Sequence, residues 1–82
     1  MYKIEQKEQL IDAVIMEFYQ FAKVLPKEVL THEFVSRYLF NRVPQQFENH
    51  QLRLFSFTVI AIGDLMFEVT VNCTIVKRIF FR

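Results

Sequence analysis

The only glycine of the chain, Gly63, lies between two long runs of β-branched and aromatic residues. Such a pattern is typical of a tight β-hairpin, because glycine adopts the backbone conformation of a short loop at little steric cost. With Gly63 and Asp64 as the two loop residues, Thr58 lies opposite Val69. The sequence therefore predicts an antiparallel hairpin whose register is set at this glycine.

In this register the two faces of the hairpin differ in polarity. One face is almost wholly apolar, and the other is apolar along its first arm and polar along its second. A lone hairpin cannot bury both faces, and a large uncovered apolar patch is unusual for a monomer. We therefore expect the large apolar residues of the second face to form a dimer or partner interface: Phe55, Phe57, Val59 and Met66.

The N-terminal part of the chain has helical character. An apolar stripe with helical spacing runs from Lys3 to about Val24 and predicts a first helix. Pro26 ends that helix and suits the first turn of a new one. The second helix then begins either at Pro26 or, after a short turn capped by Thr31, at His32.

Pro44 is expected to stop the second helix within Asn41–Pro44, after which residues 45–50 form a short third helix. Beyond Ile75 the chain either prolongs the hairpin or makes a third short strand. The predicted fold class is α+β, with two or three N-terminal helices followed by a long C-terminal antiparallel β-hairpin. We expect residues 1–82 to form a single compact domain.

Composition narrows the classes of protein further. The chain has 82 residues, 52% of them hydrophobic, and a formal net charge of +1, which does not require a polyanionic partner. Cys73 is the single cysteine, and the predicted register places it on the apolar face as a small hydrophobe. One cysteine forms no internal disulfide, so we expect a cytoplasmic protein. Charges interrupt the N-terminal region and no uncharged apolar run is long enough to span a membrane, so we expect no targeting or membrane-spanning segment.

No motif specifies a reaction. His32 and Glu33 begin like the helical motif of zinc proteases, but position 36 is serine where that motif requires a second histidine. One glycine cannot make a phosphate-binding glycine-rich loop. We expect no metal, no cofactor and no enzyme activity.

An alternative arrangement places helix, turn and helix within residues 31–55, with the hairpin following as a wing. That order resembles a winged-helix protein, and the resemblance implies a DNA-binding transcriptional regulator. Its nucleic-acid contacts would come from the second helix and the basic tail: Gln45, Gln46, Asn49, Arg53, Lys77, Arg78 and Arg82. The absence of a basic residue at the hairpin tip and the low net charge count against this alternative.

The leading hypothesis is a small, non-catalytic, protein-binding regulator or inhibitor. It would act as a homodimer through an apolar surface of the hairpin and helices. Its partners would be another protein, a second copy of itself, or both, with DNA as the partner in the alternative.

Overall fold

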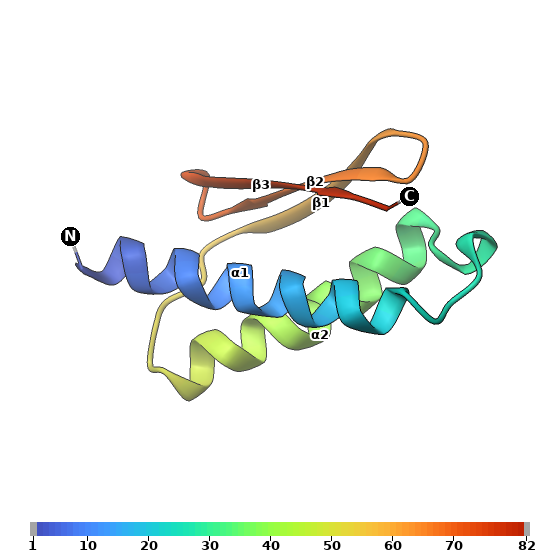
Figure 1. Cartoon of the computed structure of the whole chain (residues 1–82). Helices are drawn as coiled ribbons and strands as arrows, with labels where there is room; N and C mark the ends of the chain where they lie inside the picture. The colour runs from blue at the N-terminus through green and yellow to red at the C-terminus, as the bar shows by residue number, and fades with distance from the viewer. Residues whose placement is uncertain (1, 82) are drawn as a thin grey trace.

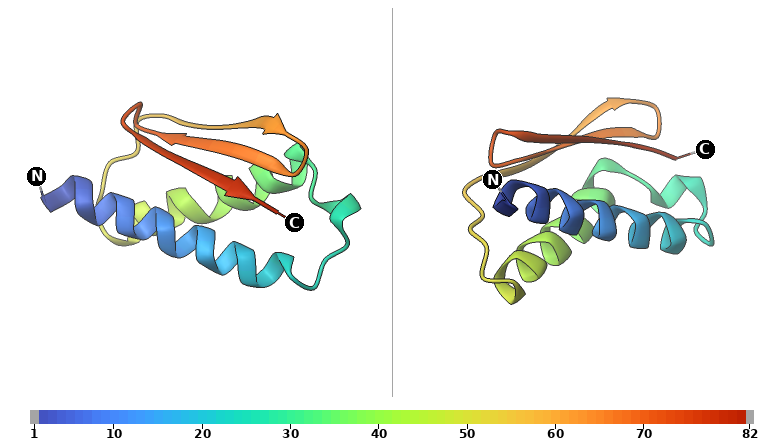
Figure 2. Two further views of the ribbon diagram at one scale, coloured as in Figure 1. Left: turned by 45° about the horizontal axis from the view of Figure 1, so that its top comes forward. Right: turned by 60° about the vertical axis from the view of Figure 1, so that its left-hand side comes forward.

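Two helices and a short 3₁₀ turn precede three strands, and both helices lie on the same side of the sheet (Figures 1 and 2). The computed structural model describes the backbone of residues 2–81 and the side chains of residues 5–81. The elements are α1 (Tyr2–Ala22), η1 (Lys27–Val29), α2 (His32–Asn49), β1 (Phe57–Gly63), β2 (Met66–Val71) and β3 (Ile75–Phe80). The predicted α+β class is confirmed.

The apolar stripe of α1 faces the core, as its spacing predicts. The stripe places five residues in the buried core, namely Ile11, Val14, Ile15, Phe18 and Ala22. They recur every three or four positions, which is the period of one helix face. The helix ends before Pro26, which cannot continue it.

The start of α2 follows the second of the two alternatives. Lys27–Val29 forms a single 3₁₀ turn, and the α-helix begins at His32. Thr31 is the N-cap, and its Oγ1 accepts a hydrogen bond of 3.2 Å from the backbone N–H of Phe34. This contact satisfies one of the N–H groups that a helix start leaves without a partner.

The predicted stop at Asn41–Pro44 is wrong, because α2 continues through Pro44 to Asn49. Proline deprives the Phe40 carbonyl of its helical N–H donor. Apolar residues on both sides of the proline outweigh this loss because they are buried at intervals of four: Val35, Leu39, Val43 and Phe47. Residues 45–50 therefore form no separate helix, and residues 31–55 contain no helix–turn–helix such as a winged helix requires.

The tail after Ile75 forms a third strand instead of prolonging the hairpin. The sheet is antiparallel throughout, in the order β1-β2-β3. Asn72 and Cys73 make the turn between β2 and β3 with φ values of 55° and 61°. Cys73 is exposed in this turn, so its predicted place on an apolar face is wrong.

The register of β1 also differs from the prediction. Val69 pairs with Val59, one residue beyond the expected partner. The loop is shifted as well: Gly63 is the last residue of β1, and Leu65 has the positive φ of 57°. The shifted loop alone would pair Val69 with Ile60, and the bulge between Ala61 and Gly63, which inserts one extra residue into β1, moves that partner back to Val59.

Gly63 therefore matters because it has no side chain and leaves space for its neighbour. It does not adopt a left-handed backbone conformation. Its φ is not positive, and it lies opposite Met66 at the end of the ladder. A Cβ atom at this position would meet the terminal methyl group of Met66. The glycine thus lets the Met66 side chain fold across the end of β1.

Asn72 connects the β2–β3 turn to the segment that leads into β1. Its Oδ1 accepts hydrogen bonds from the backbone N–H groups of Phe55 (2.6 Å) and Ser56 (3.3 Å). Its Nδ2 donates to the Arg53 carbonyl at 3.1 Å. One side chain therefore fixes the segment that enters β1, which lies at the same end of the sheet as the β2–β3 turn.

We expect Asn72→Gly to lower the free energy of unfolding by about 1–3 kcal/mol, because it removes these three hydrogen bonds while tolerating the positive φ. Asn72→Ala should lose roughly 1 kcal/mol more, since its Cβ opposes a left-handed backbone. Urea denaturation followed by circular dichroism measures both values. A glycine variant as stable as the wild type would show that the side chain does not hold this segment.

Candidate functional site

The face of the sheet that points away from the helices is uncovered (Figure 2). We call it the open face. In β2 its residues Met66, Glu68 and Thr70 alternate with buried ones. The register adds Val76, Arg78 and Phe80 of β3 and Thr58 and Ile60 of β1, with Ile62 beside them at the bulge. Four of them are large, apolar and 41–51% exposed, namely Ile60, Ile62, Val76 and Phe80. The open face is therefore an apolar surface in contact with water.

One ion pair lies within the open face. Glu68 and Arg78 are cross-strand neighbours, and Arg78 Nε lies 3.2 Å from Glu68 Oε2. The Glu68 side chain is 23% exposed and that of Arg78 is 62% exposed, so the guanidinium is the more accessible of the two charges. The open face thus carries one positive and one negative charge among apolar side chains.

The backbone of each outer strand forms a hydrogen bond with a helix side chain. His32 Nε2 lies 2.6 Å from the carbonyl oxygen of Val59 in β1, and this contact requires a proton on Nε2 because a carbonyl only accepts. Tyr19 Oη accepts a hydrogen bond of 3.1 Å from the backbone N–H of Phe80 in β3. These contacts occupy backbone groups that would otherwise be available to a strand of another chain.

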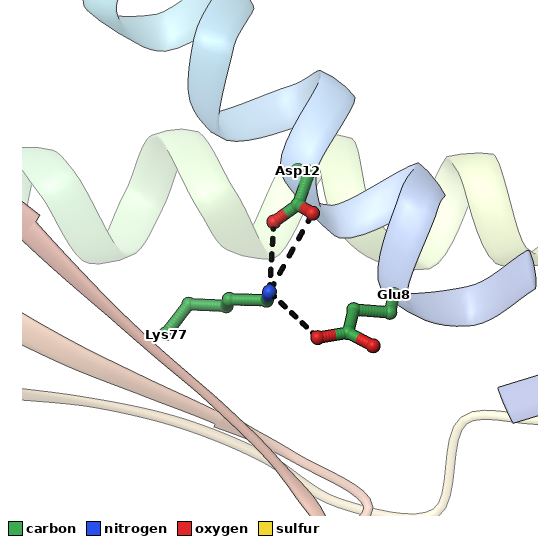
Figure 3. Close-up of polar contacts among 3 residues, drawn as sticks. All are labelled: Glu8, Asp12 and Lys77. Carbon is green, nitrogen blue, oxygen red and sulfur yellow. Dashed lines mark hydrogen bonds and ion pairs between the residues drawn. The ribbon is translucent and has the colours of Figure 1, made fainter. Parts of the chain in front are cut away.

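Lys77 joins β3 to α1 on the covered side of the sheet (Figure 3). Its Nζ lies 2.8 Å from Glu8 Oε2 and 3.1 Å from Asp12 Oδ1. The hydrogen bond with Glu8, supported by Asp12, raises the pKa of Lys77 despite partial desolvation, which acts in the opposite direction. Lys77 is thus engaged within the chain, whereas the nucleic-acid alternative requires it at the surface.

The residues predicted for a partner interface have separate locations. Val59 is 6% exposed and lies in the core, so it is unavailable to a partner. Phe57 is half-buried, and its ring meets that of Phe40 edge-on at a centroid distance of 4.7 Å. Phe55 is 68% exposed but precedes β1, so of the four residues only the half-buried Met66 lies on the open face.

The sequence prediction missed the residues that make the open face apolar. β1 is apolar at odd and even positions alike, so a shift of one residue exchanged its two faces. Val76 and Phe80 were missed because the third strand was left undecided. The sequence of β3, Ile-Val-Lys-Arg-Ile-Phe, does not alternate apolar and polar residues, so it offered no period-two signal for a strand.

The residues of the nucleic-acid alternative are divided among three parts of the chain. Three lie on the last turns of α2, namely Gln45, Gln46 and Asn49, and Arg53 follows in the segment before β1. The guanidinium of Arg53 lies over the Phe55 ring, 5.0 Å from its centroid. Lys77 and Arg78 are both in ion pairs, and Arg82 is outside the described residues.

A second apolar surface is the hollow between α1 and α2, which has a volume of about 280 Å³. It is lined by three aromatic side chains together with one guanidinium and one amide: Phe21, Phe34, Tyr38, Arg37 and Asn41. The Phe21 and Tyr38 rings stack at 5.7 Å. This hollow is an apolar surface on the helical layer, apart from the open face.

Among the described residues, no helix combines the length and the apolar character needed to cross a membrane. The same part of the chain contains no group of three or more His, Cys, Asp or Glu side chains placed to hold a metal ion. Comparisons with protein families, with characterised proteins and with solved structures found no match. Function is therefore inferred from the geometry of the chain itself.

We expect Lys77→Met to lower the free energy of unfolding by up to about 1 kcal/mol at neutral pH, since partly exposed ion pairs contribute about that much. The raised pKa means that this stabilisation is complete below the ordinary value of 10.5 and is lost as the pH rises through the raised value. Urea unfolding of both proteins from neutral pH to above pH 10.5 should show the difference shrinking.

The control for this prediction is the same substitution in an E8Q/D12N background. There, Lys77→Met should have little effect, because the carboxylates that stabilise the ammonium group are gone. An equal effect in both backgrounds would contradict the assigned contact.

Proposed function

We propose that this chain is a non-catalytic protein-binding module whose open face binds a second copy in a weak homodimer. The observation that supports this proposal is the gathering of Ile60, Ile62, Val76 and Phe80 on one uncovered surface. Fully burying a large apolar side chain contributes about 1.5–3 kcal/mol, and these side chains are only about half-buried in the single chain. Covering the face with another protein surface would gain the rest of this burial free energy, which the single chain leaves unrealised.

A second copy is the partner that the charges favour. Glu68 and Arg78 give the open face one charge of each sign, so two copies can oppose unlike charges. A strongly charged partner would leave one of the two side chains next to a like charge. The face is therefore complementary to itself.

The size of the open face sets the expected strength of pairing. Three strands about 4.8 Å apart and about 20 Å long cover roughly 300 Å² in plan. A standard stable interface buries about 800 Å² per partner. We therefore expect a weak dimer, with a dissociation constant in the micromolar range or above.

The role that fits such a surface is that of a small regulator or inhibitor. A protein of this kind acts by occupying a surface, and weak pairing leaves the open face accessible at low concentration. Dimerisation would then control how much of the face is free.

We expect Val76→Asp to keep the protein monomeric at concentrations where the wild type dimerises, because it places a carboxylate in the apolar contact. Sedimentation velocity from about 1 µM to 1 mM should show the wild-type mass rising above 9.9 kDa towards twice that value. Circular dichroism confirms that the variant is folded.

The matched control is Val24→Asp, which makes the same change at a side chain that is 80% exposed and follows α1. This variant should dimerise like the wild type. A wild type that stays at 9.9 kDa throughout, or a control that dissociates as Val76→Asp does, would refute the proposal.

A further inference from the structure

We infer that two copies pair about a twofold axis that runs parallel to the strands, between β2 and β3, so that each Arg78 faces Glu68 of the other copy. This inference rests on the proposed function. It specifies which parts of the open face meet and what selects a second copy as the partner.

The first step comes from the register, which arranges the outward side chains in rows across the sheet. The central row contains Ile60, Glu68 and Arg78, one from each strand. The rows on either side place Thr70 beside Val76, and Met66 beside Phe80. The positions of the charges relative to the apolar side chains are therefore known.

The second step is the choice of axis, considered for the three simplest placements. An axis along the central row sets Glu68 opposite Glu68 and Arg78 opposite Arg78. An axis along β2 sets Glu68 opposite itself and Arg78 opposite Ile60. Only an axis between β2 and β3 sets each carboxylate opposite a guanidinium, which avoids the cost of opposing like charges in a poorly hydrated contact.

The third step is that the same axis also brings apolar side chains together. It places Phe80 opposite Met66 and Val76 opposite the methyl-bearing Thr70. β1 lies outside this contact, so Ile60 and Ile62 stay uncovered and only two of the three strands meet, with roughly 200 Å² in plan. Apolar contact on both sides of the charges excludes water from them, which strengthens their attraction.

The fourth step concerns the reach of the guanidinium. Packed sheets lie about 10 Å apart, a gap that a long arginine side chain helps to bridge. Arg78 is 62% exposed, and its contact within the chain uses Nε. A guanidinium carries five N–H donors, so Arg78 can contact Glu68 of both copies in a cluster of four charges.

The test uses two charge reversals, Glu68→Lys and Arg78→Glu. Each variant alone presents two like charges on its open face, and we expect each to dimerise at least about tenfold more weakly than the wild type. An equimolar mixture opposes two positive charges to two negative ones, so we expect the mixture to form a heterodimer within about threefold of wild-type affinity. Mixing cannot restore the ion pair within either chain, so rescue reports contact between chains.

Sedimentation of the separate and mixed variants, with native mass spectrometry to identify the heterodimer, gives the readout. The matched control is the exposed pair of Glu33 and Arg37 on α2, which lie 3.1 Å apart. Glu33→Lys and Arg37→Glu should each dimerise like the wild type, alone or mixed. Added salt should weaken the rescued heterodimer.

Three results would overturn the inference, and they are distinguishable. If the wild type dimerises, Val76→Asp prevents it and the mixture shows no rescue, the charges of Glu68 and Arg78 do not meet across the contact, so the inference fails and the proposed function stands. If the wild type stays monomeric throughout, the inference and the proposed homodimer both fail. Phe80→Ala weakening the dimer no more than Ile60→Ala would also contradict the axis between β2 and β3.

Discussion

The pairing of β1 with β2 determines which side chains lie in the core and which lie on the open face. Successive side chains of a strand point to opposite faces, so a shift of one residue exchanges every position of β1. The bulge between Ala61 and Gly63 makes this shift. It buries Val59 and leaves Ile60 outside. Had the ladder run without the bulge, the candidate surface would contain different residues.

The helices were largely predictable, and the strand register was not. Apolar spacing identified α1, and Thr31 gave the start of α2 because a cap is a local contact. Pro44 was misleading, since a local rule for proline competes with buried contacts at Val35, Leu39, Val43 and Phe47. Those contacts depend on the sheet against which the helix packs, which sequence spacing alone does not reveal.

The sequence predicted that an apolar surface would stay uncovered, but it did not predict which residues form that surface. The surplus of apolar residues in the C-terminal half already indicated a surface that two helices could not cover. To locate this surface, one must know which residues of β1 point outward and that the chain forms the third strand, β3. Neither had a local signal, because both faces of β1 are apolar and the β2–β3 turn has positive φ at Asn72 and Cys73 without a glycine.

The outer strands of the sheet are protected against pairing with another chain, whereas the open face is not. This contrast agrees with the proposal that another protein surface covers the open face. Tyr19 and His32 each form a hydrogen bond with the backbone of an outer strand. These features oppose pairing through the edges. The open face lacks comparable protection: it tolerates polar residues at Thr58 and Thr70, yet most of its positions are apolar. Large apolar side chains at these positions add to stability only where another surface covers them, which the proposed pairing would do for part of the open face.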